Sequence, residues 1–508
     1  MRQTLVQWRN PATLPSARGQ RLLLALLVTL PLGGCALTQG IFTTLGPNHQ
    51  APAAAVARWH APAPAIGVAH LQAHGGSNEA LKTWWQQFDD PLLTELLAAA
   101  QRESASLAQA AARIERARAD AVAANVAGNP SVDATAGATR SAFSFGGPAL
   151  LRSQAQVGLQ SSWEIDLFGG LARQREAARA QLEADIAAWH DARVALAAEV
   201  ANAYLNMRFC EMQIALALAD ALSRAETARL TGIAAAAGLQ APSFLALARA
   251  SAADGAAALA QRGVECEIGI KGLVALTAMG ESALRAKLAG APQLAARLPK
   301  PAQFPIDGVP AGVLAQRPDI AAAERAVAVA SAEIGVREAE RYPRLTLAGN
   351  IAPTRSRLDG SPTISVTTWS IGPSLIVPLL DGNRRAANVE AARAQYEAAS
   401  AIYRGRVRSA VREVEEALVK LAGVATRLGD THAAASGYRE SLEGARTRQR
   451  AGLGSLIEVE DARRISFAAD GAVAALDYEG VSAWIALYRA VGGGWDGKTD
   501  LAQTRAKP

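Results

Sequence analysis

Two carboxylates near the end of the sequence have a spacing suited to electrostatic chemistry. Glu458 and Asp461 lie three residues apart in the stretch 456–464 (LIEVEDARR), so they share one face if this stretch is helical. Carboxylates grouped on one face of a pore favour cations and disfavour anions by Coulomb attraction. The alternative is that acids near the start of a helix complement its dipole and face water.

Catalytic chemistry has no comparable signal. The sequence contains no phosphate-binding glycine loop, no His-Glu-x-x-His zinc helix and no nucleophile elbow. The 52 Lys and Arg residues exceed the 46 Asp and Glu residues only slightly, and they are spread along helical stretches rather than clustered as nucleic-acid binding requires. We therefore expect no enzyme activity, no cofactor and no nucleic-acid partner. Four of the six histidines lack metal-site spacing, so we expect no metal; they are His49, His60, His70 and His74.

The N-terminus has the features of an export signal. Arginines precede the apolar run 22–30, which is too short to span a bilayer as a helix. The run leads to residues 32–35 (LGGC), which resemble the lipobox of bacterial lipoproteins. The sequence thus predicts a signal peptide over 1–34 and a lipid anchor at Cys35, with a plain signal peptide as the alternative. The resemblance implies sorting to the outer membrane, because no aspartate follows Cys35.

Composition favours long helices packed through small side chains. The 508 residues are 50% hydrophobic but only 5% aromatic. The stretch 35–77, rich in Ala, Pro, Gly and His, has no hydrophobic periodicity and reads as an extended tether.

The remaining sequence contains an internal duplication. Residues 177–181 (AARAQ) recur as 391–395 (AARAQ), a spacing of 391 − 177 = 214. A Pro at 130 finds a counterpart at 343, a spacing of 213. We assign the first repeat to 78–300 and the second to 301–495, followed by a polar C-terminal tail over 496–508.

Each repeat is predicted to hold a helix, two strands, a very long helix, a glycine-containing turn and a returning helix. A helix of about 65 residues without proline would be roughly 100 Å long at a rise of ~1.5 Å per residue. In the first repeat the segments are 91–127, 131–167, 171–236, 238–242 and 243–280. In the second repeat they are 317–341, 344–379, 384–450, 451–455 and 456–490.

The predicted strands alternate between apolar and polar residues. Val157, Leu159 and Trp163 face one way, and Gln156 and Gln160 face the other. A half-buried soluble sheet has the same period. However, four strands cannot close a barrel, and an open edge in lipid leaves backbone groups unpaired. Three chains would supply about twelve strands, so the pattern favours a homotrimer with one shared barrel.

Two cysteines have a symmetric placement about the first turn. Cys210 precedes Gly238 by 238 − 210 = 28 residues, and Cys266 follows it by 266 − 238 = 28. In an antiparallel hairpin the two lie level. An exported protein meets an oxidising compartment, so we hypothesise a Cys210–Cys266 disulfide. The alternative is two buried thiols that pack as small apolar residues.

Other motif residues fit local structural roles. Pro318 and Asp319 suit the first turn of a helix, since proline is tolerated there and an acid meets the positive end of the dipole. Ser243, directly after a proline, is expected to cap the helix that leaves the first turn. Trp84 and Trp85 are expected to pack the base of the first helix.

Three motifs together resemble a known family. They are residues 84–92 (WWQQFDDPL), 316–320 (QRPDI) and 491–495 (VGGGW). The chain resembles TolC-like outer membrane factors, in particular the NodT branch of efflux lipoproteins, over nearly all of the mature sequence. The fold that this implies is mainly α-helical with a membrane β-barrel: a trimeric barrel of twelve strands continuous with a long periplasmic α-helical barrel.

The resemblance also implies roles for residues at the periplasmic end. Glu458 and Asp461 match acids that point into the duct and form rings from three subunits. Ile457 matches an apolar constriction residue, and Arg464 a basic residue that can tie the helical hairpins shut. The hairpin tips would dock a periplasmic adaptor; the tip residues are Gly238, Leu239, Gly452 and Leu453.

The predicted function is a passive exit duct for drugs or other small toxic compounds. By the resemblance, the chain is anchored in outer-membrane lipid and extends into the periplasm, where a membrane-fusion adaptor links it to an inner-membrane pump of the resistance-nodulation-division class. Two alternatives remain open: the exit duct of a type I protein-secretion machine, and a periplasmic coiled-coil lipoprotein scaffold that forms no channel.

Overall fold

A computed structural model describes residues 43–50, 60–61, 81, 83–144, 146–290, 298–299 and 310–495. The predicted signal peptide, Cys35, His70, His74 and the C-terminal tail lie outside the described residues. The chain divides into two compact units, and each repeat contributes to both. The sheet unit comprises 1–48, 122–177 and 331–394, and the helical unit comprises 49–121, 178–330 and 395–508.

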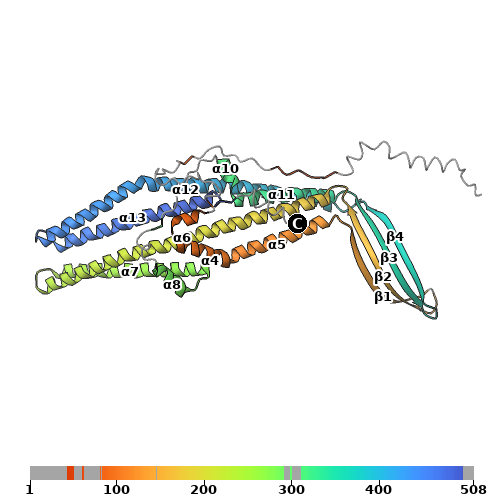
Figure 1. Cartoon of the computed structure of the whole chain (residues 1–508), viewed down its shortest axis with the longest axis horizontal. Helices are drawn as coiled ribbons and strands as arrows, with labels where there is room; N and C mark the ends of the chain where they lie inside the picture. Colours follow the sequence, from red (N-terminus) through yellow and green to blue (C-terminus); the bar gives the residue numbers. More distant parts are fainter. Residues whose placement is uncertain are drawn as a thin grey trace, which may run out of the picture. The chain divides into compact units, whose positions relative to one another are not determined.

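Helices dominate the chain, and four strands form one sheet (Figure 1). In chain order the elements are η2 (Trp84–Phe88), α4 (Pro91–Glu103), α5 (Ala105–Val126), β1 (Ser131–Phe143), β2 (Leu150–Ile165), α6 (Gly170–Ala236), α7 (Pro242–Thr277), α8 (Glu281–Ala289), α10 (Pro310–Ala315), α11 (Pro318–Ala339), β3 (Arg344–Leu358), β4 (Ile364–Ile376), α12 (Arg384–Arg450) and α13 (Leu456–Ala490).

The elements of the two repeats correspond at a nearly constant spacing. Helices α6 and α12 each have 67 residues and begin 384 − 170 = 214 residues apart. Helices α5 and α11 each have 22 residues and begin 318 − 105 = 213 apart. In Figure 1, α7 returns along α6 and α13 returns along α12, as the predicted hairpins require.

Two predicted helices differ from those observed. The expected helix 91–127 is broken at Ser104, whose extended backbone ends α4 and whose hydroxyl accepts the N–H of Leu107 at 3.3 Å. A serine at this position competes for helical hydrogen bonds, so it separates two helices. The helix predicted over 243–280 ends at Thr277, and the short α8 follows.

The sheet has the antiparallel order β1-β2-β3-β4, and its register aligns residues of one kind into rows. One apolar row consists of Ala134, Leu159, Ile351 and Trp369. The polar row beside it consists of Asp133, Gln160, Asn350 and Ser370. The two kinds of side chain therefore point to opposite faces, as the alternation predicts. Within one chain, β1 and β4 each keep one unpaired edge.

Residues 43–48 pack against the sheet unit rather than forming a free stretch of the predicted tether. The guanidinium of buried Arg173 donates to the carbonyls of Leu45 and Gly46 at 2.9 and 3.1 Å. Gly46 has a φ of 85°, and a Cβ there would approach the Cα of Gly335 to 2.5 Å. Glycines thus allow the segment to lie directly on α11.

Aromatic residues fill the core of the helical unit. The rings of Trp84 and Tyr488 stack with centroids 4.7 Å apart, and Trp85 meets the Tyr488 ring edge-on at 4.8 Å. Trp84 is fully buried, which confirms the packing role predicted for it. Burial raises the pKa of Tyr488 to about 12.

Arg317 joins the start of α11 to the end of α13. Its guanidinium donates to both carboxylate oxygens of Asp319, at 2.9 and 2.7 Å, to Glu413 at 2.8 Å, and to the carbonyl of Ala490 at 2.8 Å. Pro318 begins α11 as expected. The buried charge is compensated on every side, so this motif has a structural function.

The glycine triplet after α13 follows from close packing. Gly492, Gly493 and Gly494 all have positive φ, at 95°, 59° and 83°. A Cβ on Gly492 would lie 2.3 Å from the carbonyl oxygen of Gln316, and one on Gly493 would lie 2.6 Å from Val194. Only glycine satisfies both the backbone conformation and the contact. The second and third sequence motifs therefore meet in space.

Candidate functional site

The two hairpin tips of the helical unit have the same structure. Gly238 and Gly452 end their long helices with φ of 74° and 75°. The next N–H, of Leu239 or Leu453, donates to the carbonyl five residues earlier at 2.9 or 2.8 Å, which is the Schellman pattern. Each leucine is 79% exposed. The turn geometry therefore presents one apolar side chain at each tip.

The helices that leave the tips start differently. Ser455 caps α13 and accepts the N–H of Glu458 at 3.1 Å, which makes Glu458 the third helical residue. An acid at this position also complements the helix dipole. At α7 the cap is Ala241, which has no capping side chain. The expected cap by Ser243 is wrong, because Pro242 already begins the helix and Ser243 lies inside its first turn.

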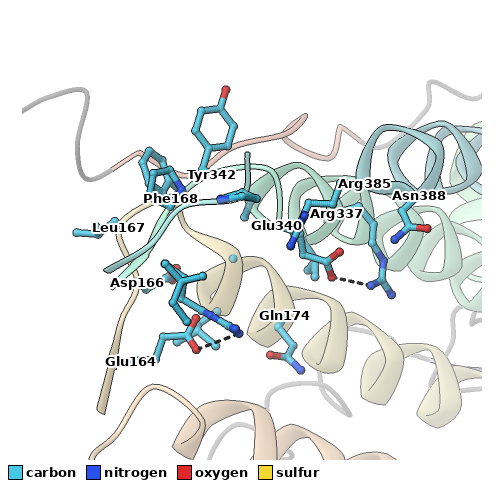
Figure 2. Close-up of a pocket in the computed structure, with 18 of the residues that line it drawn as sticks. Glu164, Asp166, Leu167, Phe168, Gln174, Arg337, Glu340, Tyr342, Arg385 and Asn388 are labelled. Carbon is cyan, nitrogen blue, oxygen red and sulfur yellow. Dashed lines mark hydrogen bonds and ion pairs between the residues drawn. The ribbon is translucent and has the colours of Figure 1, made fainter. Parts of the chain in front are cut away.

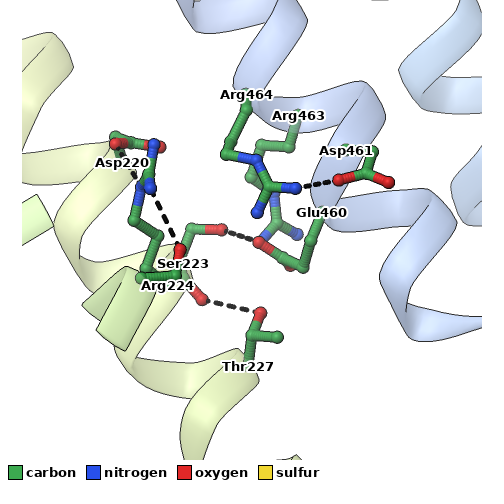
Figure 3. A network of polar contacts seen from close by, with 9 residues as sticks. Asp220, Ser223, Arg224, Thr227, Glu460, Asp461, Arg463 and Arg464 are labelled. Carbon is green, nitrogen blue, oxygen red and sulfur yellow. Dashed lines mark hydrogen bonds and ion pairs between the residues drawn. The ribbon is translucent and has the colours of Figure 1, made fainter. Parts of the chain in front are cut away.

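A buried polar contact connects the two hairpins (Figure 3). Ser223 on α6 donates its hydroxyl hydrogen to the carboxylate of Glu460 on α13, and Arg463 on α13 donates to the Ser223 oxygen. Arg463 also donates to Glu460 at 2.5 Å. Ser223 and Glu460 are 8% and 3% exposed. We call Ser223, Glu460 and Arg463 the hairpin lock.

The residues predicted from the sequence lie around this lock on α13. The side chains of Glu458 and Asp461 are 56% and 54% exposed. Arg464 bonds to Asp461 on its own helix, and it is Arg463 that contacts α6. Ile457 is 42% exposed and lines the cavity described below. The carboxylates thus stay open to solvent within one chain.

The sequence interpretation missed Glu460 as a functional residue. It selected Glu458 and Asp461 because they share one helical face, and it treated the third acid of the same stretch as unremarkable. The pair Glu460 and Arg463 has the i, i+3 spacing of a helical ion pair. Together with Ser223 in the middle of a long helix, this spacing was the available signal, but the contact between distant segments depends on tertiary packing.

A cavity of about 230 Å³ lies beside the lock within the helical unit. Phe244 and Leu247 of α7 and Ile457 of α13 form its apolar part. Arg224 also lines it, and its guanidinium is held by Asp220 at 2.7 Å. Space between the two hairpins leaves them free to move against one another once the lock opens.

Cys210 and Cys266 are joined by a disulfide in the structure, with Cα atoms 5.6 Å apart. The bond connects α6 and α7, whose residues lie level as the sequence spacing predicts. It fixes the register of the first hairpin between its base and its tip.

A second, larger cavity lies in the sheet unit, where the strands meet the helices (Figure 2). Its volume is about 670 Å³. Its charged side chains are largely paired: Glu340 accepts from Arg337 at 2.7 Å, and Glu164 lies 3.9 Å from Arg344. Compensated carboxylates of this kind are poor general acids or bases.

Two further searches of the described residues concern the membrane and metals. No helix there combines the length and apolarity needed to cross a membrane. No group of three or more potential ligands among the described His, Cys, Asp and Glu residues is placed to hold a metal ion.

Comparison with known proteins places this architecture. Residues 96–265 and 309–493 match the outer membrane efflux protein family. The chain is 30% identical over 483 residues to outer membrane protein OprJ of Pseudomonas aeruginosa, covering 93% of this chain and 95% of OprJ. It is 29% identical over 420 residues to nodulation protein T of Rhizobium leguminosarum bv. viciae, covering 82% and 85%. The solved outer-membrane channel OprN has a TM-score of 0.77 at 29% identity, covering 89% of this chain and 99% of that one. These matches confirm the resemblance to TolC-like, NodT-type channels: the chain belongs to the outer membrane efflux protein family.

Proposed function

We propose that this protein is the outer-membrane exit duct of a tripartite efflux pump and that it passively conducts drugs or other small toxic compounds. One observation carries the proposal: the sheet has one apolar and one polar face, and its two end strands are unpaired within the chain. A sheet of this kind satisfies its backbone in lipid only by closing with other copies.

The assembly we propose is a homotrimer. Three sheets of four strands supply about twelve strands, which is enough to enclose a lumen. The apolar rows would then face lipid and the polar rows would face the lumen. Large exposed side chains on the apolar face support this orientation, since Trp369 and Ile371 are 73% and 70% exposed in one chain.

The hairpin lock would act as a gate at the periplasmic end. The lock holds α13 against α6, so breaking it frees the second hairpin to move. Glu458 and Asp461 would supply acidic rings to the passage in the trimer and favour cations. Ile457 and Arg464 would narrow it. The exposure of both acids in one chain supports this role.

The partners are proposed from the same arrangement. Exposed Leu239 and Leu453 at matching tips suit a periplasmic membrane-fusion adaptor, which would link the duct to an inner-membrane pump of the resistance-nodulation-division class. A lipid attached at Cys35 would hold the chain to the outer membrane. Transport energy would come from the pump, and the duct itself would be no enzyme.

The testing experiment combines the mass of the detergent-purified complex, corrected for bound detergent, with conductance in planar bilayers. A mass near three subunits together with discrete channel openings is the expected result. A monomer without conductance would refute the duct and favour a lipid-anchored periplasmic scaffold.

A further inference from the structure

Strand β4 ends earlier than its counterpart in the first repeat. Strand β2 covers Leu150–Ile165, and adding the repeat spacing of 214 gives 364–379. The observed β4 begins at the expected Ile364 but ends at Ile376, three residues short. Residues 377–379 therefore lack the strand conformation that residues 163–165 have.

The pairing explains the difference. The pairing of β1 with β2 begins at Ser131 and Ser162, so β2 residues 163–165 extend past β1 and are held by β3 alone, for example Ile165 by Leu345. In the second repeat, the pairing of β3 with β4 stops at Ile376. Residues 377–379 likewise extend past their neighbour, and one chain offers no strand on their other side.

The side chains of this segment are unusually bare. Leu379 is 91% exposed and Leu380 is 95% exposed, and Val377 is 46% exposed. The facing edge of the sheet is bare as well, since Val132 near the start of β1 is 66% exposed. Unpaired backbone beside exposed aliphatic side chains is a site for strand addition.

We propose that residues 377–379 pair antiparallel with residues 132–134 of β1 in a second copy of this chain, in one defined register. The internal duplication gives that register. Paired residues of β2 and β3 have numbers that sum to 165 + 345 = 510. Replacing β2 by β4 adds 214 and replacing β3 by β1 subtracts 213, so the sum across the subunit boundary is 510 + 214 − 213 = 511. Leu379 then faces Val132 of the second copy.

The register passes a test that did not enter its derivation. A sum of 511 places Leu375 of the apolar face beside Ala136, which also belongs to that face. It places Ser370 of the polar face beside Ser141, which lies on the polar face too. A shift by one residue would put every apolar row of one copy beside polar rows of the next. Both faces therefore continue unbroken across the boundary.

This inference rests on the proposed function, because it requires that copies share one sheet. Its test is the double variant Ser370→Cys with Ser141→Cys, which replaces two small polar-face residues. Oxidation with copper phenanthroline should link most chains into a covalent species of three chains on a denaturing gel. The native Cys210–Cys266 bond joins residues of one chain and does not alter this count.

Two matched controls keep the same face but change the sum. Ser370→Cys with Thr139→Cys has a sum of 509, and Ser370→Cys with Phe143→Cys has a sum of 513. Both should link at the background level of the single variants. More efficient linking of either control, or no linking of the 511 pair in an intact trimer, would overturn the register while leaving the trimer in place. A monomeric mass for the unmodified protein would instead overturn the proposed function.

Discussion

Removing the Ser223 hydroxyl should loosen the gate without dismantling the channel. In Ser223→Ala, α13 loses both of its lock contacts to α6, whereas Glu460 and Arg463 keep their own bond at 2.5 Å. No buried charge is left alone, so the variant isolates the contact between hairpins. We expect a larger fraction of time in the open, conducting state.

The size of the effect follows from the type of bond. A hydrogen bond to a charged group contributes about 1.5–3 kcal/mol. Ser223 is 8% exposed and Glu460 3%, so water replaces little of that energy in the closed state. At about 1.4 kcal/mol per factor of ten, the open-to-closed ratio should rise roughly 10- to 150-fold for each subunit.

The assay is single-channel recording in planar bilayers, with the trimer verified by mass. Thr227→Val is a matched control, because the Thr227 hydroxyl bonds only within α6, to the carbonyl of Ser223 at 3.0 Å. It removes a hydroxyl one turn away and leaves the lock intact. If Ser223→Ala and Thr227→Val both conducted like the parent protein, the lock would not gate the duct.

Three further predictions concern charge, the disulfide and pH. Asp461→Asn should lower the cation-to-anion permeability ratio, measured as a reversal potential in a salt gradient; an unchanged ratio would place Asp461 outside the passage. Cys210 and Cys266 should resist alkylation until reduced, and their joint replacement by Ala should destabilise the protein by about 4 kcal/mol, since the bond spans 56 residues; free thiols in native protein would contradict this. Burial, and next the charge of Asp319, raise the pKa of Asp191 above its ordinary 3.8. The folded state therefore favours the protonated acid, and the stability that this gives is lost as pH rises through the raised pKa. Asp191→Asn should accordingly be more stable than the parent at pH 7 and lose that advantage near its ordinary pKa, and urea unfolding at both pH values would show a constant difference if this reasoning failed.

The long hairpins were predictable because their signals are local and repeated. The recurrence at 214 residues, the glycines at 238 and 452, and the absence of proline specify α6, α12 and their turns. The break at Ser104 was harder, since a serine in a helical pattern usually has little effect and only its capping geometry separates α4 from α5. Local patterns decide where a helix runs, whereas single side chains decide where it stops.

The gate depended on information that a sequence pattern lacks. Helical spacing identified Glu458 and Asp461 as neighbours, but the buried acid is Glu460, which meets Ser223 from 237 residues away. Contacts between such distant segments arise from packing. The end of β4 at Ile376 has the same origin, because strand length there depends on a partner and not on the residues themselves.

The two hairpin turns of the sheet differ where the repeats otherwise agree. The spacing between repeats changes from 213 at the start of β3 to 214 at the start of β4, so the turn after β1 is one residue longer once the strands are aligned. Strand register is preserved on both sides of this change. Length variation is therefore tolerated in these turns and nowhere else in the sheet, which makes them the natural place to insert an epitope tag or a fluorescent label without disturbing assembly.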